Sequence, residues 1–479
     1  MSEPGPKKSQ SKAEEGAEFN KAKAANSKRS DAGASVEEPR QKNPQFRAMR
    51  GVRDILPPET ALWNRVEQTA RDVFTTFGFG EIRLPIFETT ELFARSVGED
   101  TDIVSKEMFT FPLGYDPDSL SDTAAGKTVT LRPEATASVC RAYIEHGMNS
   151  LPQPVKLYYW GPMFRRERPQ KGRHRQFFQI GAEVLGGNDA PGIDAEVIDM
   201  VMTFFDKLEL QGLELDINSI GCRECRAKYV EVLRDALLQV KDKLGPDSQR
   251  RIDTNPLRVL DSKLENEQEI IATLPRMAAH LCPDCAEHFA EVKRQLELRG
   301  VIYRENWRLV RGLDYYMRTT FEITAQGLGS QNAVCGGGRY DGLVELLGGP
   351  PAKGIGFAIG EDRLILSLQE SGKAPAPKGP DIYIAWMGEK AFATGIRAAK
   401  DLRSAGYRVE LPATEQKFGK ALGQADKLGS RYALILGEDE VTTGEWTLKT
   451  LADGSQKKYT ENDLLEYLRE TTSAVRQQL

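Results

Sequence analysis

Apolar side chains recur every third or fourth residue between positions 59 and 77 of the chain. This spacing places them on one face of a helix with about 3.6 residues per turn. Gly78 follows the last of them, and glycine is common just past the end of a helix. The pattern therefore predicts an amphipathic helix near the start of the ordered part of the chain. Its apolar positions are Leu62, Val66, Ala70, Val73 and Phe77.

Short apolar runs predict the strands that follow this helix. A strand at residues 128–132 leads through Pro133 into a helix at residues 134–145. Glu134 and Thr136 are therefore expected at a turn between strand and helix. Further strands are predicted at residues 80–85, 213–217, 308–310 and 319–324, and a further helix at residues 194–208.

The hydrophobic pattern changes character along the chain, which indicates several domains. The N-terminal tail is rich in Ser, Ala, Glu and Lys and has too little apolar surface to fold. Residues 221–299 show long charged helices, and the last hundred residues alternate strand and helix as in a small α/β domain. The predicted parts are a disordered tail (1–45), a main domain in two pieces (46–220 and 300–369), a helical insertion (221–299), a linker (370–380) and a C-terminal domain (381–479).

Length and composition set limits on the kind of protein. At 479 residues the chain exceeds the about 250–300 residues at which a single core stops growing. A formal net charge of −5 excludes a histone-like binder, so a site for a polyanion must come from local clustering of charge. The chain has neither a membrane-length apolar run nor a hydrophobic signal region, which predicts a cytoplasmic protein without a membrane partner.

A cluster of basic residues lies between apolar runs at residues 156–160 and 176–185. Pro169 and Gly172 interrupt it, so the sequence predicts a β-hairpin with a basic loop. Arginine suits polyphosphate because its planar guanidinium donates two parallel hydrogen bonds and keeps its charge. A solvated surface loop is the simpler alternative, which phenylalanines on both flanks make less favourable. The basic residues are Arg165, Arg166, Arg168, Lys171, Arg173 and Arg175.

Four motifs together resemble the class II aminoacyl-tRNA synthetases, and more specifically the histidyl-tRNA synthetase family. They are FRRERPQKGRHRQF at residues 164–177, LRPEAT at 131–136, LVRGLDYY at 309–316 and GIGFAIGEDR at 354–363. The resemblance extends from Gly51 to the C-terminus. It implies an α+β fold: an antiparallel-sheet catalytic domain interrupted by the helical insertion, and a C-terminal α/β domain that binds the anticodon. A regulatory or dimerisation module is the alternative for the C-terminal domain.

The resemblance implies a histidine–tRNA ligase, which activates L-histidine with ATP and transfers the histidyl group to the 3′ end of tRNA(His), releasing AMP and diphosphate. The first step is an in-line attack on the α-phosphate, whose growing charge fixed cations would stabilise. The implied catalytic residues are Arg311 and Arg165, although Arg311 could also be a surface arginine. The implied ATP ligands are Arg165, Glu167, Arg173 and Arg363. Glu167 would lie near Mg²⁺ or form a salt bridge with a neighbouring arginine.

The resemblance also implies a site that selects histidine. Glu183 lies in an otherwise apolar strand, where a buried carboxylate needs either a ligand or a structural ion pair. The two tyrosines of the LVRGLDYY motif could instead be core aromatics. The implied histidine-binding residues are Glu134, Thr136, Gln179, Glu183, Arg311, Tyr315, Tyr316 and Tyr340. Arg168 and Gln170 are candidates for contacts with the acceptor end of the tRNA.

Two Cys-x-x-Cys pairs open and close the insertion. Each pair has the ligand spacing of tetrahedral zinc, and an insertion whose two ends meet would bring the pairs together. Four reduced thiols without metal, or a redox function, are the alternatives, and the family resemblance implies no zinc here. The cysteines are Cys222, Cys225, Cys282 and Cys285. No function is expected for Cys140, a buried thiol, or for His146 and His174, surface imidazoles.

The partners implied by the resemblance are tRNA(His), histidine, ATP and a second copy of the chain. A homodimer would pair through residues 66–88, where an apolar helix and strand are predicted. Two other classes of protein are possible: the regulatory paralogue associated with ATP phosphoribosyltransferase and a sensor module that no longer aminoacylates. The paralogue typically lacks the Arg311 segment and the C-terminal domain. Both are present here, as is the full set of site residues.

Overall fold

The computed structural model describes residues 46–98, 101, 103–112, 128–313, 315–325, 332–373 and 379–476. The predicted N-terminal tail, residues 1–45, lies outside the described residues. Among the described residues, no helix combines the length and apolar character that crossing a bilayer requires.

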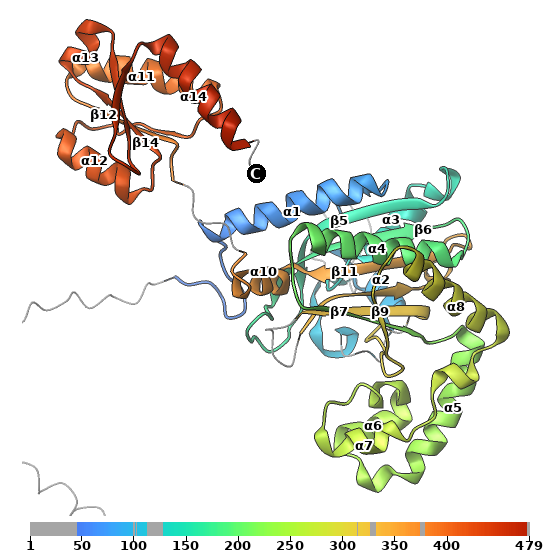
Figure 1. Cartoon of the computed structure of the whole chain (residues 1–479). Helices are drawn as coiled ribbons and strands as arrows, with labels where there is room; N and C mark the ends of the chain where they lie inside the picture. The colour runs from blue at the N-terminus through green and yellow to red at the C-terminus, as the bar shows by residue number, and fades with distance from the viewer. Residues whose placement is uncertain are drawn as a thin grey trace, which may run out of the picture. The chain divides into compact units, whose positions relative to one another are not determined.

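An eight-stranded sheet forms the centre of the main domain (Figure 1). Its strand order is β1-β5-β6-β11-β10-β9-β7-β8. Neighbouring strands run antiparallel except at the edges, where β1 pairs parallel with β5 and β8 pairs parallel with β7. The predicted α+β fold with an antiparallel sheet is therefore confirmed. The strands are β1 (Gly80–Glu81), β5 (Val155–Phe164), β6 (Gln176–Leu185), β7 (Leu213–Ser219), β8 (Arg304–Glu305), β9 (Met317–Ala325), β10 (Ala333–Arg339) and β11 (Gly354–Gly360).

Four helices bury one face of this sheet, and their apolar side chains form the largest core. Phe74 of the first helix is fully buried, with its ring 5.7 Å from that of Phe204 and 5.8 Å from that of Phe357 on the sheet. The predicted amphipathic helix is thus present, and its apolar stripe faces the core. The four helices are α1 (Glu59–Thr76), α4 (Pro191–Lys207), α8 (Pro283–Leu298) and α10 (Glu361–Glu370).

A second layer of structure covers part of the sheet's other face. A three-stranded sheet, in the order β2-β4-β3, leads into helix α3, which packs against strands β5 and β6 through a separate apolar cluster. The elements of this layer are β2 (Phe87–Thr89), α2 (Thr90–Val97), a π-helix (Ile103–Glu107), β3 (Phe109–Pro112), β4 (Thr128–Leu131), α3 (Thr136–Glu145), a 3-10 helix (Met148–Ser150) and the short α9 (Leu343–Leu346).

The insertion is helical, as predicted. Residues 221–299 are all described and contain helices and turns but no strand, with a small apolar core of their own. The last helix, α8, also contributes Val292 and Leu296 to the main core, so the insertion returns directly into the main domain. Besides α8, its elements are α5 (Arg223–Gln239), α6 (Pro246–Thr254), α7 (Glu265–Ala272) and the 3-10 turns Lys241–Lys243, Pro256–Val259 and Met277–His280.

The C-terminal domain is a five-stranded sheet, in the order β13-β12-β14-β15-β16, with helices packed on it. The predicted alternation of strand and helix is confirmed, and two elements are additional: the short helix α13 and strand β16. The elements are β12 (Ile382–Trp386), α11 (Glu389–Ser404), β13 (Val409–Glu410), α12 (Phe418–Lys427), β14 (Tyr432–Leu436), α13 (Glu438–Thr443), β15 (Trp446–Thr450), β16 (Gln456–Tyr459) and α14 (Glu461–Arg476).

One predicted strand is shorter than expected and another is absent. The strand expected at residues 80–85 stops after Glu81, although the Ile82 N–H still donates to the Tyr158 carbonyl at 2.8 Å; further along, the Arg132 guanidinium donates to the Leu84 carbonyl at 3.0 Å. The strand expected at residues 308–310 is absent. There, Leu309 N–H donates to the Asn306 carbonyl at 2.9 Å, and the Asn218 side-chain amide donates to the Leu309 carbonyl at 3.0 Å. In both places a side chain donates a hydrogen bond to a backbone carbonyl that could otherwise accept one from a neighbouring strand.

Candidate functional site

A polar cavity of about 750 Å³ opens on the face of the main sheet opposite the α1 and α4 layer. Strands β5, β6, β10 and β11 and the Arg311 loop form its walls, and residues of the insertion line one side. The predicted site residues in its lining are Glu134, Thr136, Arg165, Glu167, Arg173, Gln179, Glu183, Arg311, Tyr315, Tyr316, Tyr340 and Arg363. The sequence therefore identified the members of one cavity from segments that are far apart in the chain.

The basic segment is the predicted hairpin loop between β5 and β6. Arg165 is held by a hydrogen bond from its Nε to the Pro133 carbonyl at 3.0 Å, and its guanidinium lies 5.3 Å from the centre of the Phe177 ring. Glu167 pairs with Arg173 at 2.8 Å and with Arg165 at 3.8 Å. The loop thus presents two arginines to the cavity from fixed positions, so it is more than a solvated surface loop.

Arg311 enters the cavity from the loop before β9. Its Nη1 donates to the Glu322 carboxylate at 2.6 Å. The guanidinium also lies against the bare backbone of Gly336, where an added Cβ would come within 2.0 Å of Nη2. Glycine at this position on β10 therefore leaves the space that Arg311 occupies. Arg311 is not a surface arginine, since only 22% of its side chain is exposed.

Glu183 is the most perturbed carboxylate of the cavity. Its side chain is buried, and it accepts hydrogen bonds from the Thr136 hydroxyl at 2.7 Å and the Tyr340 hydroxyl at 2.6 Å. Burial raises the pKa of Glu183 to about 8, against the lowering effect of the two hydroxyls. The structural ion pair considered as an alternative is absent, since both described partners are neutral hydroxyls.

A second buried carboxylate of the cavity, that of Glu134, also stabilises the start of a helix. Glu134 precedes α3, and its carboxylate accepts the backbone N–H of Thr136 at 2.7 Å and of Ala137 at 3.0 Å. It therefore caps the helix in the manner of an N-cap side chain. Burial raises the pKa of Glu134 above its ordinary value. The rings of Tyr315, Tyr316 and Tyr340 pack together beside these carboxyls, with Tyr315 4.8 Å from Tyr316 and 5.7 Å from Tyr340.

Arg363 and its neighbours close the opposite end of the cavity. Arg363 donates to the Ala333 carbonyl at 2.9 Å, and burial together with the charge of Arg173 lowers its pKa. The next residue back, Asp362, accepts the backbone N–H of Phe178 at 2.9 Å and lies 3.8 Å from His174. The expectation of a surface imidazole was wrong for His174, which lines the cavity and is mostly covered.

Comparison with known proteins agrees with this geometry. The family model described as histidyl-tRNA synthetase matches residues 51–364, and the model described as anticodon binding domain matches residues 381–471. The chain belongs to the histidyl-tRNA synthetase family. It is 52% identical to a histidine–tRNA ligase of Koribacter versatilis, over 88% of this chain and 96% of the relative. It is 51% identical to one of Solibacter usitatus, over 88% and 98%.

A solved structure is similar to this chain over the same share of its length. The apo histidyl-tRNA synthetase of S. aureus superposes with a TM-score of 0.72 at 36% identity, covering 88% of this chain and 99% of that one. The chain is therefore similar to members of its family over nearly their whole length, including the insertion and the C-terminal domain.

The two hairpin residues considered for tRNA contact lie apart from the cavity lining. Arg168 and Gln170 are both exposed on the loop. Gln170 exchanges backbone hydrogen bonds with Arg173 at 3.1 and 2.9 Å, which fixes the tip of the hairpin. Their side chains are accessible, and their role remains a prediction.

Several residues of the cavity were missed by the sequence analysis. Glu322 lies between buried Phe321 and Ile323 on β9, so the same signal that singled out Glu183, a carboxylate in an apolar strand, was available for it. The insertion also contributes polar side chains, and no local pattern shows which of its many charges face inward. These residues are Asp247, Ser248, Arg251, Asp261, Ser262 and Lys263.

Proposed function

We propose that this chain activates L-histidine with ATP and transfers the histidyl group to tRNA(His). The observation that supports it best is that one cavity combines arginines suited to phosphate with a buried carboxyl and hydroxyls suited to an imidazole. Membership of the histidyl-tRNA synthetase family gives the reaction, and the cavity gives each residue a task. The reaction takes place in the cytoplasm, where charged tRNA is used.

Arg311 and Arg165 act at the reacting α-phosphate. The histidine carboxylate attacks this phosphorus in line with the departing diphosphate, and negative charge gathers on the phosphate oxygens. Two fixed guanidinium groups stabilise that charge more in the transition state than in the ground state. Arg311 is held by Glu322 and Arg165 by the Pro133 carbonyl, so both guanidinium groups lie in the cavity before the nucleotide binds.

Arg173 and Arg363 bind the outer phosphates and the adenine side of ATP. Burial and the nearby Arg173 lower the pKa of Arg363, which is the cost of placing like charges together without an anion. A polyphosphate removes this repulsion. Glu167 and Glu322 are carboxylates of the kind that Mg²⁺ prefers, but both are paired with arginine. Mg²⁺ accompanying ATP would therefore depend mainly on phosphate oxygens, with Glu167 and Glu322 as the nearby carboxylates that could assist. Zinc takes no part in the chemical steps of this reaction.

Histidine binds at the Glu183 end of the cavity. A site that pairs both ring nitrogens rejects amino acids that lack them. Glu183 accepts from one imidazole nitrogen, Tyr316 contacts the ring, and Tyr315 and Tyr340 form the wall. The α-ammonium group is bound by Glu134, Thr136 and Gln179. In the described part of the chain the buried Gln179 Oε1 has no hydrogen-bond partner, and an ammonium group would supply its missing donor.

Histidine-dependent exchange of pyrophosphate into ATP tests this function. The exchange should require histidine and ATP, proceed without tRNA, and fall sharply in Arg311→Ala. A protein that shows no exchange with histidine would disprove the function. Unchanged exchange in Arg311→Ala would disprove the role of that residue while leaving the function intact.

The chain also acts as a homodimer in this proposal. The apolar stripe of α1 lies in the chain's own core, since Val66 and Phe74 are fully buried, so it is not the interface. Ile86 and Phe87 within the proposed region are 45% and 59% exposed and are available for a partner. Light scattering should give twice the chain mass of 53.3 kDa. The double variant Ile86→Asp, Phe87→Asp should be a monomer. The domain limits and the tRNA contacts of Arg168 and Gln170 belong to the same proposal.

A further inference from the structure

The four cysteines of the insertion meet at a single point. Cys222 and Cys225 lie at the N-terminus of α5, and Cys282 and Cys285 lie at the N-terminus of α8. Their four Sγ atoms all lie within 4.8 Å of one another, and the Sγ atoms of Cys222 and Cys225 are 3.5 Å apart. A disulfide requires about 2.05 Å, whereas four sulfurs at about 2.3 Å from one tetrahedral zinc are about 3.8 Å apart. The spacing fits a single metal ion.

The surroundings of the sulfurs favour thiolates. Both pairs sit at helix N-termini, where the helix dipole stabilises negative charge. The Cys282 backbone N–H donates to Cys225 Sγ at 3.1 Å. Arg318 lies close enough to Cys285 for the two charges to interact, which places a cation beside the cluster. Gly221 has a φ of +66°, and a Cβ there would lie 2.7 Å from the Cys225 Cβ. Glycine at this position thus leaves the space that the Cys225 side chain occupies.

We propose that Cys222, Cys225, Cys282 and Cys285 bind one Zn²⁺, and that this ion positions the tyrosines of the histidine site. Four thiolates give the complex a charge of −2, which the Arg318 guanidinium offsets. Zinc is preferred over harder metals because all four donors are sulfur. The site lies outside the cavity, so zinc acts through the protein and not on the substrate. The second part of the proposal rests on the proposed function.

The first route from the metal site to the cavity runs through α5. Arg226 follows directly after Cys225, and its Nη1 donates to the Tyr316 carbonyl at 2.7 Å. The backbone beside the cluster continues the connection, because Arg318 N–H donates to the Gly221 carbonyl at 2.8 Å. Arg318 has a φ of +49°, a backbone conformation that residues other than glycine rarely adopt. The metal therefore anchors the start of β9 just after Tyr316.

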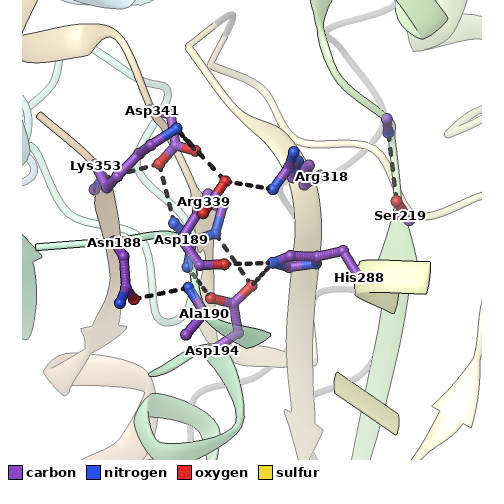
Figure 2. Close-up of polar contacts among 12 residues, drawn as sticks. Asn188, Asp189, Ala190, Asp194, Ser219, His288, Arg318, Arg339, Asp341 and Lys353 are labelled. Carbon is purple, nitrogen blue, oxygen red and sulfur yellow. Dashed lines mark hydrogen bonds and ion pairs between the residues drawn. The ribbon is translucent and has the colours of Figure 1, made fainter. Parts of the chain in front are cut away.

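The second route runs through α8, and Figure 2 shows its polar contacts from His288 to Asp194 and Arg339. His288 is one turn beyond Cys285, and its Nε2 lies 3.2 Å from the Asp189 carbonyl and 3.7 Å from the Asp194 carboxylate. Asp194 is fully buried and pairs with Arg339 at the end of β10. Arg339 directly precedes Tyr340, whose hydroxyl donates to Glu183. Near its start at the metal site, each of the two helices thus contacts a segment that leads to a wall of the proposed histidine pocket.

Metal analysis tests the first part of the proposal. The full chain, purified under reducing conditions without chelator, should contain one zinc per chain. Cobalt exchanged into the same protein should give tetrahedral d–d bands and an intense thiolate charge-transfer band. Cys225→Ser, Cys285→Ser should lose both signals, and Cys140→Ser, at a free cysteine outside the cluster, should keep them. Three results with the native protein would each overturn the proposal: no zinc together with no cobalt charge-transfer band, iron in place of zinc, or two disulfides. None of these results depends on a variant that must fold.

Kinetics tests the second part. Arg226→Ala keeps all four cysteines and should retain zinc, while the KM for histidine in pyrophosphate exchange rises about fivefold or more. The KM for ATP should change little, because Arg165, Arg173 and Arg363 are held by other segments. Arg234→Ala on the same helix is the matched control and should leave both KM values unchanged. Equal changes in both KM values, or none, would refute the positioning role. Absence of exchange in the unmodified, zinc-loaded protein would instead refute the proposed function and leave the metal site standing.

Discussion

Replacing Glu183 by glutamine should change how the stability of the protein depends on pH. Burial raises the pKa of Glu183 to about 8 from 4.5 in the unfolded chain. The folded protein therefore holds this proton more tightly than the unfolded chain does. The contribution of Glu183 to the free energy of unfolding is complete below about pH 4.5 and is lost as the pH rises through 8. Glutamine has the same shape, keeps a hydrogen-bonding carbonyl and has no proton to lose.

The size of the effect follows from the shift. Each unit of pKa corresponds to about 1.4 kcal/mol, so between pH 5.5 and 8 the wild type should lose about 3 kcal/mol relative to Glu183→Gln. Groups that titrate elsewhere are common to both proteins and cancel in the difference. Thermal unfolding followed by calorimetry at several pH values measures it, with Glu269→Gln, at an exposed glutamate, as the control that should show no such trend. A stability difference that stays constant across this pH range would refute the burial argument.

The same variant should bind histidine poorly. When the imidazole binds, it can take the proton of Glu183 and leave a carboxylate, which glutamine cannot become. Glu183→Gln therefore loses a charge-assisted hydrogen bond worth about 1.5–3 kcal/mol, so the KM for histidine should rise about 10- to 100-fold. The KM for ATP should not follow, since the ATP residues lie at the other end of the cavity. A variant with normal KM for histidine would show that Glu183 is a structural residue only, even if its pH dependence is as expected.

Three further changes test separate parts of the site. Arg311→Ala should lower the kcat of pyrophosphate exchange about 10²- to 10³-fold with little change in melting temperature, since a charge-stabilising donor is lost from a partly exposed position. Gly336→Ala should give a similar loss by displacing Arg311, measured in the same assay against Gly419→Ala, where an added Cβ meets no atom within 4 Å. Asp194→Ala should lower the free energy of unfolding by about 3–5 kcal/mol, measured by chemical denaturation, because the buried Arg339 would keep Asp341 but lose the fully buried carboxylate of Asp194. Retained exchange in either of the first two variants, or a stable Asp194→Ala protein, would contradict these assignments.

The sequence predicted those helices and strands that depend mainly on residues close together in the chain. The β5–β6 hairpin follows from two apolar runs around a loop with proline and glycine, and the helical insertion follows from its charged periodic pattern. The failures have distant causes. The strand expected at residues 308–310 is absent because the Asn218 amide, 91 residues away, takes the Leu309 carbonyl. The Asp194–Arg339 pair joins residues 145 apart, and neither neighbourhood in the sequence reveals the other.

The carboxylates of the cavity explain how so many cations remain close together before ATP binds. Glu322 pairs with Arg311, and Glu167 pairs with Arg173 and lies near Arg165, so two carboxylates offset part of the charge of these arginines. Unpaired, the buried guanidinium groups would repel one another and turn toward solvent. In the proposed function, ATP would compete with these internal pairs, and its phosphates would prevail because they carry more charge and can accept two hydrogen bonds from each arginine. Glu167 and Glu322 would then be free to hold Mg²⁺ accompanying the nucleotide. We therefore add Glu322, which lies on β9 between two buried apolar residues, to the residues proposed for ATP binding.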